Sequence, residues 1–412
     1  MVDRLRAHAF WLWIAFLAAV AAVGGYAALL VLTQGLVVTN LSDLAPWGQW
    51  IIVDLSCIGL AAGAFSLSAV THLLGRKRFE PLARIAVFIG LLGYTGALLS
   101  LAMDIGQPSR FWHGWVFWNV HSLLWEVTMC ITFYFLVLLL EVYPLVVELP
   151  FLARFKRLRA LGRRVHRFAP VLAVIGLGLS LLHQSSLGGT YGVVAGRVEL
   201  FRSTMPLLFI VSAVGAGIAF TVQMTLVVQW LKKRILVPRH VLFLAGQIAG
   251  AVLLVYLYMR FWDATVSNYN YVLAQRSTEA EALIGTGRGF FAISFRVWER
   301  LLGGLVAAAL LIVARIRQSV MLLMVGSGLA MAGLIANRWN TTMFAFTEPL
   351  SLSPPLTDPL VANYTPHAVE WAVSVGIVAG LTLVFSLGMR YLPAYRGVAP
   401  AGPAAAMTEA EA

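Results

Sequence analysis

Cysteine is nearly absent from this 412-residue chain, and its scarcity limits the redox chemistry that the chain can carry alone. Cys57 and Cys130 lie far apart in apolar stretches and form neither a Cys-x-x-Cys pair nor a metal-binding spacing. Because an iron–sulfur cluster is usually held by four cysteine thiolates, the sequence predicts no such cluster within this chain. The spacing also predicts no metal site and does not imply a disulfide.

Charge is scarce as well, since charged residues make up 12% of the chain and hydrophobic residues 60%. A soluble domain carries about 25% charged residues, so the composition excludes an ordinary soluble protein. The net charge of +12 could indicate a nucleic-acid partner, but the Lys and Arg residues gather in short segments between apolar stretches. That placement is typical of membrane orientation and of contact with anionic lipid headgroups. We therefore expect membrane lipid as a partner and no nucleic acid.

Ten apolar segments approach or exceed the length of about 20 residues that a helix needs to cross a bilayer. Every second loop between them is rich in Lys and Arg, which places these loops and both termini in the cytoplasm by the positive-inside rule. The Trp-Glu dipeptide at 125–126 in the fourth span recurs at 298–299 in the eighth. The predicted fold is therefore an all-α integral membrane protein with ten transmembrane helices, arranged as two four-helix bundles plus a C-terminal helix pair.

The predicted membrane domain covers residues 1–398, and an Ala/Pro/Glu-rich cytoplasmic tail at 399–412 is expected to be disordered. The ten expected spans are residues 10–32, 50–74, 84–104, 119–143, 168–187, 205–230, 238–260, 296–315, 319–337 and 366–391.

Ionisable side chains gather in the outer half of the membrane in this topology. Such groups are costly in hydrocarbon unless they are paired or reached by water, so each one marks a candidate site. Asp54 follows the start of the second span, and Asp104 ends the third. Glu126 is expected roughly 10 Å inside the fourth span, and His183 lies near the outer end of the fifth. For the inner half we expect only the polar residues Gln223, Gln247, His72 and His240.

These residue types suit quinone chemistry, in which two protons accompany each two-electron conversion. His183 could hydrogen-bond a quinone carbonyl and exchange its proton, because imidazole titrates near neutral pH. Glu126 could take up or release a proton, and Asp54 or Asp104 could hold the imidazole in one tautomer. A satisfied hydrogen bond between helices is the other interpretation of Asp54 and Glu126, and helix-end anchoring is that of Asp104.

A second polar cluster is predicted from Glu299, Arg300 and Arg338, at the ends of the eighth and ninth spans. Its composition favours a structural ion-pair cluster. Two further residues, His367 and Glu370, begin the last span and are expected to face water.

Several segments carry a family resemblance. Residues 104–112, Asp-Ile-Gly-Gln-Pro-Ser-Arg-Phe-Trp, resemble the DxGxPxRFW loop of the NrfD/polysulfide reductase membrane-subunit (PsrC) family, and residues 118–127 resemble its following helix. Residues 183–188, His-Gln-Ser-Ser-Leu-Gly, resemble the HQSSLG signature of the ten-helix, HybB-like branch, which includes the membrane subunit of periplasmic nickel–iron hydrogenases. The likeness runs from about residue 40 to residue 393.

The resemblance implies a quinone-reactive subunit of a respiratory oxidoreductase complex in the bacterial cytoplasmic (inner) membrane, with no haem or iron–sulfur cluster of its own. It implies a periplasmic ferredoxin-like iron–sulfur subunit as partner, together with a catalytic subunit such as a hydrogenase, a molybdoenzyme or a multihaem cytochrome module. The quinone, menaquinone or ubiquinone, would be the substrate. One residue departs from the pattern, since Gln107 stands where many members have arginine.

Carried over by position, the quinone and proton residues are Asp104, His121, Glu126 and His183, to which depth and proximity add Asp54 and Ser186. Three alternatives remain open. A haem b-binding cytochrome would need facing histidine pairs, for which His121 and His183 are the outer candidates. A secondary transporter would place its site at the midplane, and a purely structural anchor would leave the quinone site elsewhere in the complex.

Overall fold

A computed structural model describes residues 2–194, 202–273, 294–344, 364–392 and 395. Ten of its helices are long and apolar enough to cross a membrane, which confirms the predicted number of spans. The described part of the chain contains no β-strand, so the all-α fold is also confirmed. The predicted disordered tail at 399–412 lies outside the described residues.

The described helices begin with α1 (Val2–Gln34), η1 (Leu36–Val38), α2 (Gln49–Ala61), α3 (Gly63–His72), η2 (Lys77–Phe79), α4 (Glu80–Asp104), η3 (Pro108–Arg110), α5 (His113–Val116), α6 (Leu123–Val146), α7 (Lys156–Arg167) and α8 (Ala169–Gly192). They continue with α9 (Met205–Lys232), α10 (Arg239–Leu273), the π-helical η4 (Ser294–Val306), α12 (Ala307–Arg317), α13 (Val320–Phe344) and α14 (Ala368–Tyr391).

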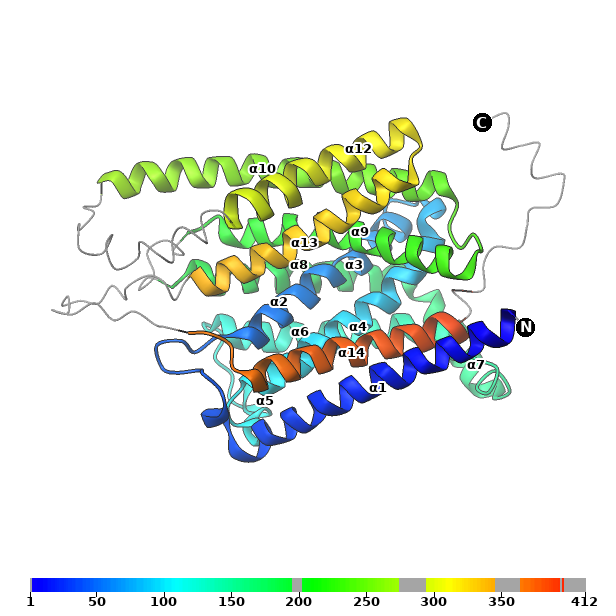
Figure 1. The fold of residues 1–412 in the computed structure, drawn as a ribbon, viewed down its shortest axis with the longest axis horizontal. Coiled ribbons are helices and arrows are strands. Elements are labelled where there is room, and N and C mark those ends of the chain that lie inside the picture. The colour runs from blue at the N-terminus through cyan, green and yellow to red at the C-terminus, as the bar shows by residue number, and fades with distance from the viewer. Residues whose placement is uncertain (1, 195–201, 274–293, 345–363, 393–394, 396–412) are drawn as a thin grey trace.

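The helices form two bundles and an outer pair (Figure 1). The first bundle consists of α2 with α3, α4, α6 and α8, and the second of α9, α10, η4 with α12, and α13. The pair joins α1 to α14. The outer pair therefore consists of the first and the last membrane span, whereas the sequence predicted a pair of the last two spans. The repeated Trp-Glu dipeptide still falls in the third span of each bundle.

Close backbone contacts explain this grouping. A Cβ atom on Gly24 of α1 would overlap the Gly376 Cα of α14, so only glycine permits this crossing. The two bundles meet in the same way, because a Cβ on Gly63 would overlap the carbonyl oxygen of Gly217 in α9. Small residues at helix crossings are a common means of association in membranes, where packing replaces the hydrophobic effect.

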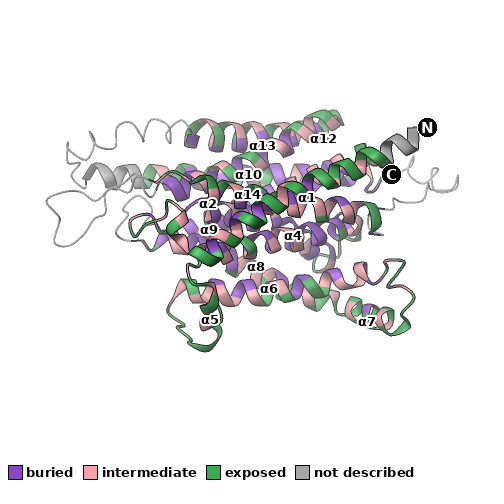
Figure 2. Cartoon of the chain, turned by 60° about the horizontal axis from the view of Figure 1, so that its bottom comes forward, coloured by how far each residue is buried: buried purple, intermediate pink, exposed green. Residues whose placement is uncertain are grey.

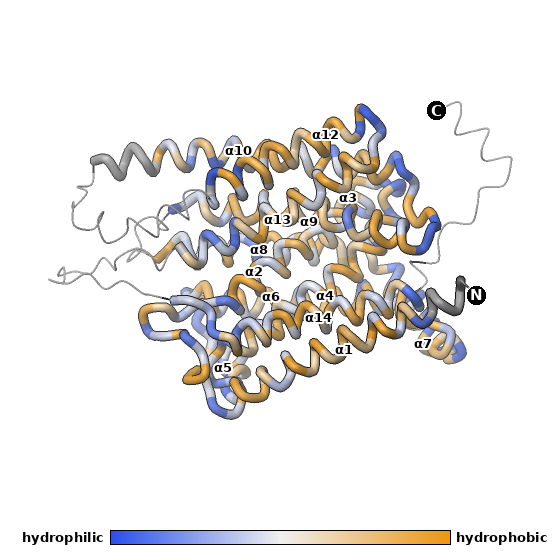
Figure 3. Tube along the Cα trace, viewed as in Figure 1, coloured by the Kyte–Doolittle hydropathy of each residue, from blue (hydrophilic) through white to orange (hydrophobic). Residues whose placement is uncertain are grey.

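The two ends of the helix array differ in charge. We call the end that holds residues 76–78, α7 and residues 232–234 the basic end, and the end that holds α5 the opposite end (Figures 1 and 3). The start of α1 and the end of α14 both lie at the basic end, where the Arg390 guanidinium is 4.5 Å from the Phe10 ring centroid. Between the ends, outward-facing apolar residues of the peripheral helices are exposed, as expected for lipid contact (Figure 2).

Candidate functional site

Buried polar groups without partners gather in the opposite half of the first bundle. His183 of α8 is completely buried, and neither of its ring nitrogens has a hydrogen-bond partner among the described residues. Its ring packs against that of Tyr94 in α4, with 5.6 Å between centroids. Asp54 of α2 is also buried, and its Oδ1 accepts no hydrogen bond in the described structure. Nearby, Gln184 Nε2 donates to the Ile58 carbonyl at 3.1 Å and ties α8 to α2.

A row of carboxylates extends from Asp54 toward the opposite end. Asp104 is the last residue of α4, as predicted, and its Oδ1 is buried without a hydrogen bond from the described residues. It lies near enough to interact electrostatically with both Asp54 and Glu370. Three acidic groups therefore share one region of low solvent access, an arrangement that is costly unless protons or a ligand reach it.

Glu370 does not face water, contrary to the sequence expectation. Its side chain is only 1% exposed, and its Oε1 accepts a hydrogen bond from the Asn40 backbone N–H at 3.0 Å. The Tyr364 hydroxyl donates to the other oxygen. Burial and this hydrogen bond raise the pKa of Tyr364, so the phenol stays protonated. The residues that precede α2 and those that precede α14 cover the start of α14 and shield the Glu370 side chain from water.

Glu126 and His121 lie differently from the predicted arrangement. The fourth membrane helix begins at Leu123, with the Ser122 side chain accepting a hydrogen bond from the Trp125 N–H at 3.4 Å. Glu126 is therefore in the first turn, half-buried and shallower than expected. His121 precedes the helix in an exposed turn. This placement separates it from His183 and does not favour a haem held by these two histidines.

Ser186 satisfies its hydroxyl within its own helix, because it donates to the Leu182 carbonyl at 2.8 Å. The structure therefore does not assign it to the group of unpartnered atoms around His183.

Polar groups continue from His183 toward the middle of the bundle. The Tyr94 and Tyr134 rings are in edge contact, with centroids 4.6 Å apart, and both side chains are buried. Their hydroxyls lie near the buried Ser180 hydroxyl without a hydrogen bond of good geometry. A small shift or an intervening water would connect all three, since buried hydroxyls normally have partners.

Glu141 continues this line in the basic half and was missed in the sequence. It lies in α6, and its Oε1 accepts a hydrogen bond from the Ser68 hydroxyl of α3 at 3.2 Å. The predicted fourth span ended at 143, which placed this carboxylate at the membrane surface. In the structure α6 continues to Val146 and α7 folds beneath it, so the carboxylate lines a cavity within the protein.

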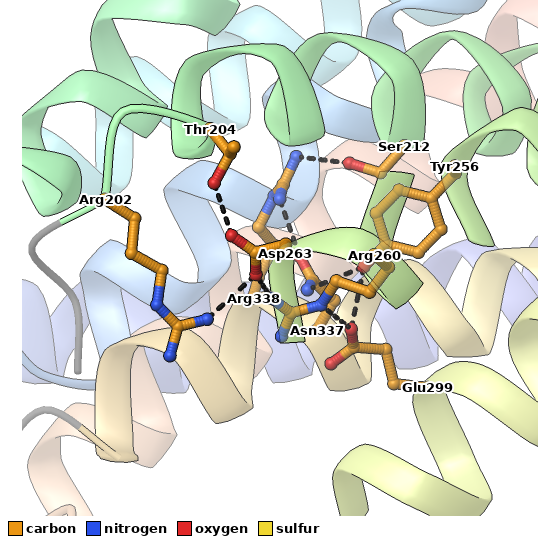
Figure 4. Close-up of polar contacts among 9 residues, drawn as sticks. All are labelled: Arg202, Thr204, Ser212, Tyr256, Arg260, Asp263, Glu299, Asn337 and Arg338. Carbon is orange, nitrogen blue, oxygen red and sulfur yellow. Dashed lines mark hydrogen bonds and ion pairs between the residues drawn. The ribbon is translucent and has the colours of Figure 1, made fainter. Parts of the chain in front are cut away.

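The second bundle also carries buried charges, but there they are mostly paired (Figure 4). Arg260 donates to Glu299 at 3.3 Å and to Asp263 at 2.8 Å. Asp263 also forms an ion pair with Arg202 at 2.8 Å and accepts a hydrogen bond from the Thr204 hydroxyl. Side chains from α10, η4 and the residues before α9 are thus tied together at the opposite end.

No ion pair joins Glu299, Arg300 and Arg338 to one another among the described residues, although Glu299 and Arg338 belong to one hydrogen-bonded network through other partners. Glu299 pairs with Arg260, and Tyr256 donates to it at 2.7 Å. Arg338 joins through Asn337, whose amide nitrogen donates to the Tyr256 hydroxyl at 3.3 Å. The Nε of Arg300 has no hydrogen-bond partner among the described residues. Arg260 was overlooked because the predicted seventh span ended at that residue, whereas α10 continues to Leu273.

We expect Arg260→Leu to lower the free energy of unfolding by about 3–5 kcal/mol, because it leaves the buried Glu299 carboxylate without a guanidinium and removes one of the two that Asp263 holds. Arg84→Leu is the matched control, since its pair with Glu80 is exposed and should contribute only about 0–1 kcal/mol. Denaturant unfolding in mild detergent measures both. Equal losses in the two variants would contradict the structural role of the Arg260 network.

Comparison with known proteins agrees with this arrangement. A family model described as "Polysulphide reductase, NrfD" matches residues 37–345, which include both bundles. The chain belongs to the NrfD family. It is 38% identical to the integral membrane subunit of menaquinone reductase from Nitratidesulfovibrio vulgaris, over 95% of this chain and 94% of the relative. These findings confirm the family resemblance and a multi-pass integral membrane protein.

Other relatives of this NrfD-family chain belong to different complexes. A selenate reductase subunit from Mesobacillus selenatarsenatis is 26% identical over 93% of this chain and 94% of its own length. A probable Ni/Fe-hydrogenase 2 b-type cytochrome subunit from Escherichia coli is 26% identical over 86% of this chain and 85% of its own length. The similarity therefore spans most of the chain in relatives that are named for different oxidoreductases.

Proposed function

We propose that this chain is the quinone-reactive membrane subunit of a respiratory oxidoreductase complex, with its quinone site in the opposite half of the first bundle. The contrast between the two bundles carries the proposal. In the second bundle Arg260, Glu299 and Asp263 neutralise one another, although Glu299 Oε2 and Arg338 Nε also lack hydrogen-bond partners among the described residues. In the first bundle Asp54 and Asp104 form no ion pair with a described residue and, like His183, hold buried atoms without hydrogen-bond partners there. Leaving a buried polar group unpaired costs about 1–3 kcal/mol, so an external group is needed to complete the site. The menaquinone reductase relative supports menaquinone as that group.

In this proposal the basic end faces the cytoplasm and the opposite end faces the periplasm of a bacterial cytoplasmic membrane, following the positive-inside rule. A ferredoxin-like iron–sulfur subunit then docks on the opposite end and links the chain to a catalytic subunit. The relatives from several oxidoreductases support such partners in general. The path for electrons from the iron–sulfur subunit to the quinone is short, because Asp104, which binds the quinone in this proposal, is the last residue of α4 and lies at the opposite end.

The chain's own residues bind the quinone and move protons. His183 donates a hydrogen bond to one carbonyl and Asp104 to the other. Neither ring nitrogen of His183 is hydrogen-bonded to Asp54 in this structure, so the predicted role of Asp54 in fixing the imidazole tautomer gains no support. Two electrons and two protons convert the quinone to the quinol, and quinol oxidation reverses each step. Glu126, half-buried at the start of α6, exchanges protons with the periplasmic side.

Protons can also come from the cytoplasmic side through the first bundle. The half-buried Glu141 lies near Tyr134, and the buried Tyr134, Ser180 and Tyr94 continue from it to His183. A route past Gln223, one of the polar residues expected in the inner half, is less suitable, because its side-chain oxygen already accepts a hydrogen bond from Ser327 at 2.5 Å. Proton uptake from the cytoplasm combined with electrons from the periplasm makes turnover generate membrane potential.

A photoreactive menaquinone tests the location of the site. In the purified complex we expect an azido-menaquinone to label peptides of α2 and α8, and excess menaquinone to suppress that labelling. Peptides of α10 and α13 serve as the internal control, because their buried charges are mostly paired. Suppressible labelling confined to the second bundle would reject the proposed site.

A further inference from the structure

A cavity of about 520 Å³ opens at the basic end of the first bundle. It lies between the membrane helices α3, α4, α6 and α8 and the short helix α7. Charged side chains line its rim, and apolar side chains of the membrane helices line its wall, among them Val87, Leu140, Leu145 and Leu172. A cavity with a polar rim and an apolar wall suits an amphiphilic ligand.

The helix α7 supplies the positive side of the rim. Its sequence from Lys156 to Arg167 has seven basic residues, counting His166, and no acidic residue. Arg159, Arg163 and His166 follow helical spacing and line the cavity, whereas Arg157 and Arg164 do not. Gly162 lies on the same face and allows close packing, because a Cβ there would lie 2.8 Å from the Val147 side chain.

Three acidic residues line the cavity, Glu80, Glu141 and the exposed Glu148, and none of them is ion-paired to α7 in the described structure. Glu80 pairs with Arg84 on the same helix at 3.2 Å, and Glu141 accepts a hydrogen bond from Ser68. No ion pair joins Arg159 or Arg163 to an acid in the described part of the chain, and both are exposed. The guanidinium groups are therefore available to an external anion.

Exposed apolar side chains flank α7 on both sides. Phe155, Leu161 and Phe168 are 47%, 48% and 62% exposed. A short basic helix with such residues is typical of one that lies at the boundary between headgroups and acyl chains. At the level of the cytoplasmic leaflet, where anionic lipids are abundant, basic pockets between helices bind phosphate headgroups.

We propose that this cavity binds an anionic phospholipid, whose phosphate is held by Arg159 and Arg163 and whose acyl chains run along Leu140 and Leu172. Guanidinium groups suit phosphate, because each can donate two charge-assisted hydrogen bonds to it. The headgroup occupies the rim and leaves Glu141 at the deep end of the cavity. The lipid site does not depend on the proposed quinone chemistry.

Native mass spectrometry of the purified, delipidated full chain with added cardiolipin tests this site. We expect Arg159→Gln/Arg163→Gln to lower cardiolipin binding about tenfold, while Arg157→Gln/Arg164→Gln, with the same loss of charge on the same helix, changes it little. Arg159→Lys/Arg163→Lys should retain most of the binding. Equal losses in both glutamine variants would show nonspecific charge attraction and overturn the proposal, as would no loss in either.

Two measurements on the unchanged chain complete the test. Hydrogen exchange of α7 should slow in nanodiscs containing cardiolipin relative to nanodiscs of phosphatidylcholine alone, and equal exchange would overturn the proposal. Inorganic phosphate at millimolar concentration should not displace cardiolipin. Displacement would identify the site as one for free phosphate and reject a lipid.

Discussion

Replacing His183 by alanine should lower quinone-coupled electron transfer at least about tenfold, because it removes the group that hydrogen-bonds the quinone and exchanges its proton. The imidazole is completely buried and has no hydrogen-bond partner among the described residues, so its loss breaks no hydrogen bond within that part of the fold. Complex assembly, measured by pull-down of the partner subunits, should remain. Quinone reduction or quinol oxidation by isolated membranes gives the rate.

Ser185→Ala is the matched control, since Ser185 lies two residues away on the same helix and its hydroxyl donates to the Leu182 carbonyl of that helix at 2.7 Å. Its turnover should stay near that of the unchanged protein. An unchanged rate in His183→Ala, with intact assembly, would identify the chain as an anchor and place the quinone site elsewhere in the complex. A loss of assembly in His183→Ala alone would instead indicate a packing role for the imidazole.

Glu141→Gln should slow quinone turnover by about tenfold and abolish the membrane potential that turnover generates. Glutamine can still accept the hydrogen bond from Ser68 but cannot take up and release a proton, so proton transfer toward Tyr134 stops. A potential-sensitive dye in proteoliposomes containing the whole complex reports the charge movement, and quinone absorbance reports the rate.

Glu148→Gln separates this role from a general effect of charge in the cavity. Glu148 lines the same cavity but is exposed, so both rate and membrane potential should be nearly unchanged. If Glu141→Gln keeps full membrane potential, the protons do not pass this residue. The quinone site around His183 would stand in that case, because the two predictions depend on different residues.

The two bundles place similar residues in different electrostatic settings. Glu126 and Glu299 follow a tryptophan at the start of the third span of each bundle. Glu299 is buried and held by Arg260 and Tyr256, whereas no described residue forms an ion pair with Glu126. The pairing in the second bundle favours a structural role, and the unpaired groups of the first bundle favour ligand and proton exchange.

The number of spans and the contrast between basic and less basic loops were predictable because they depend on local composition. A run of apolar residues long enough to cross hydrocarbon is a property of that run alone. The position of Asp104 at the end of its helix followed in the same way. The HQSSLG segment at 183–188 indicated the family by itself, because a short motif is contained in consecutive residues.

Only the tertiary structure decided which helices and which charges meet. The pairing of α1 with α14 depends on Gly24 and Gly376, which lie in the first and last spans of the chain. Arg260 became the partner of Glu299, Glu370 became buried, and Glu141 came to line a cavity, because other segments fold over them. Burial and partnership arise from packing between segments, and no single segment of the sequence contains that information.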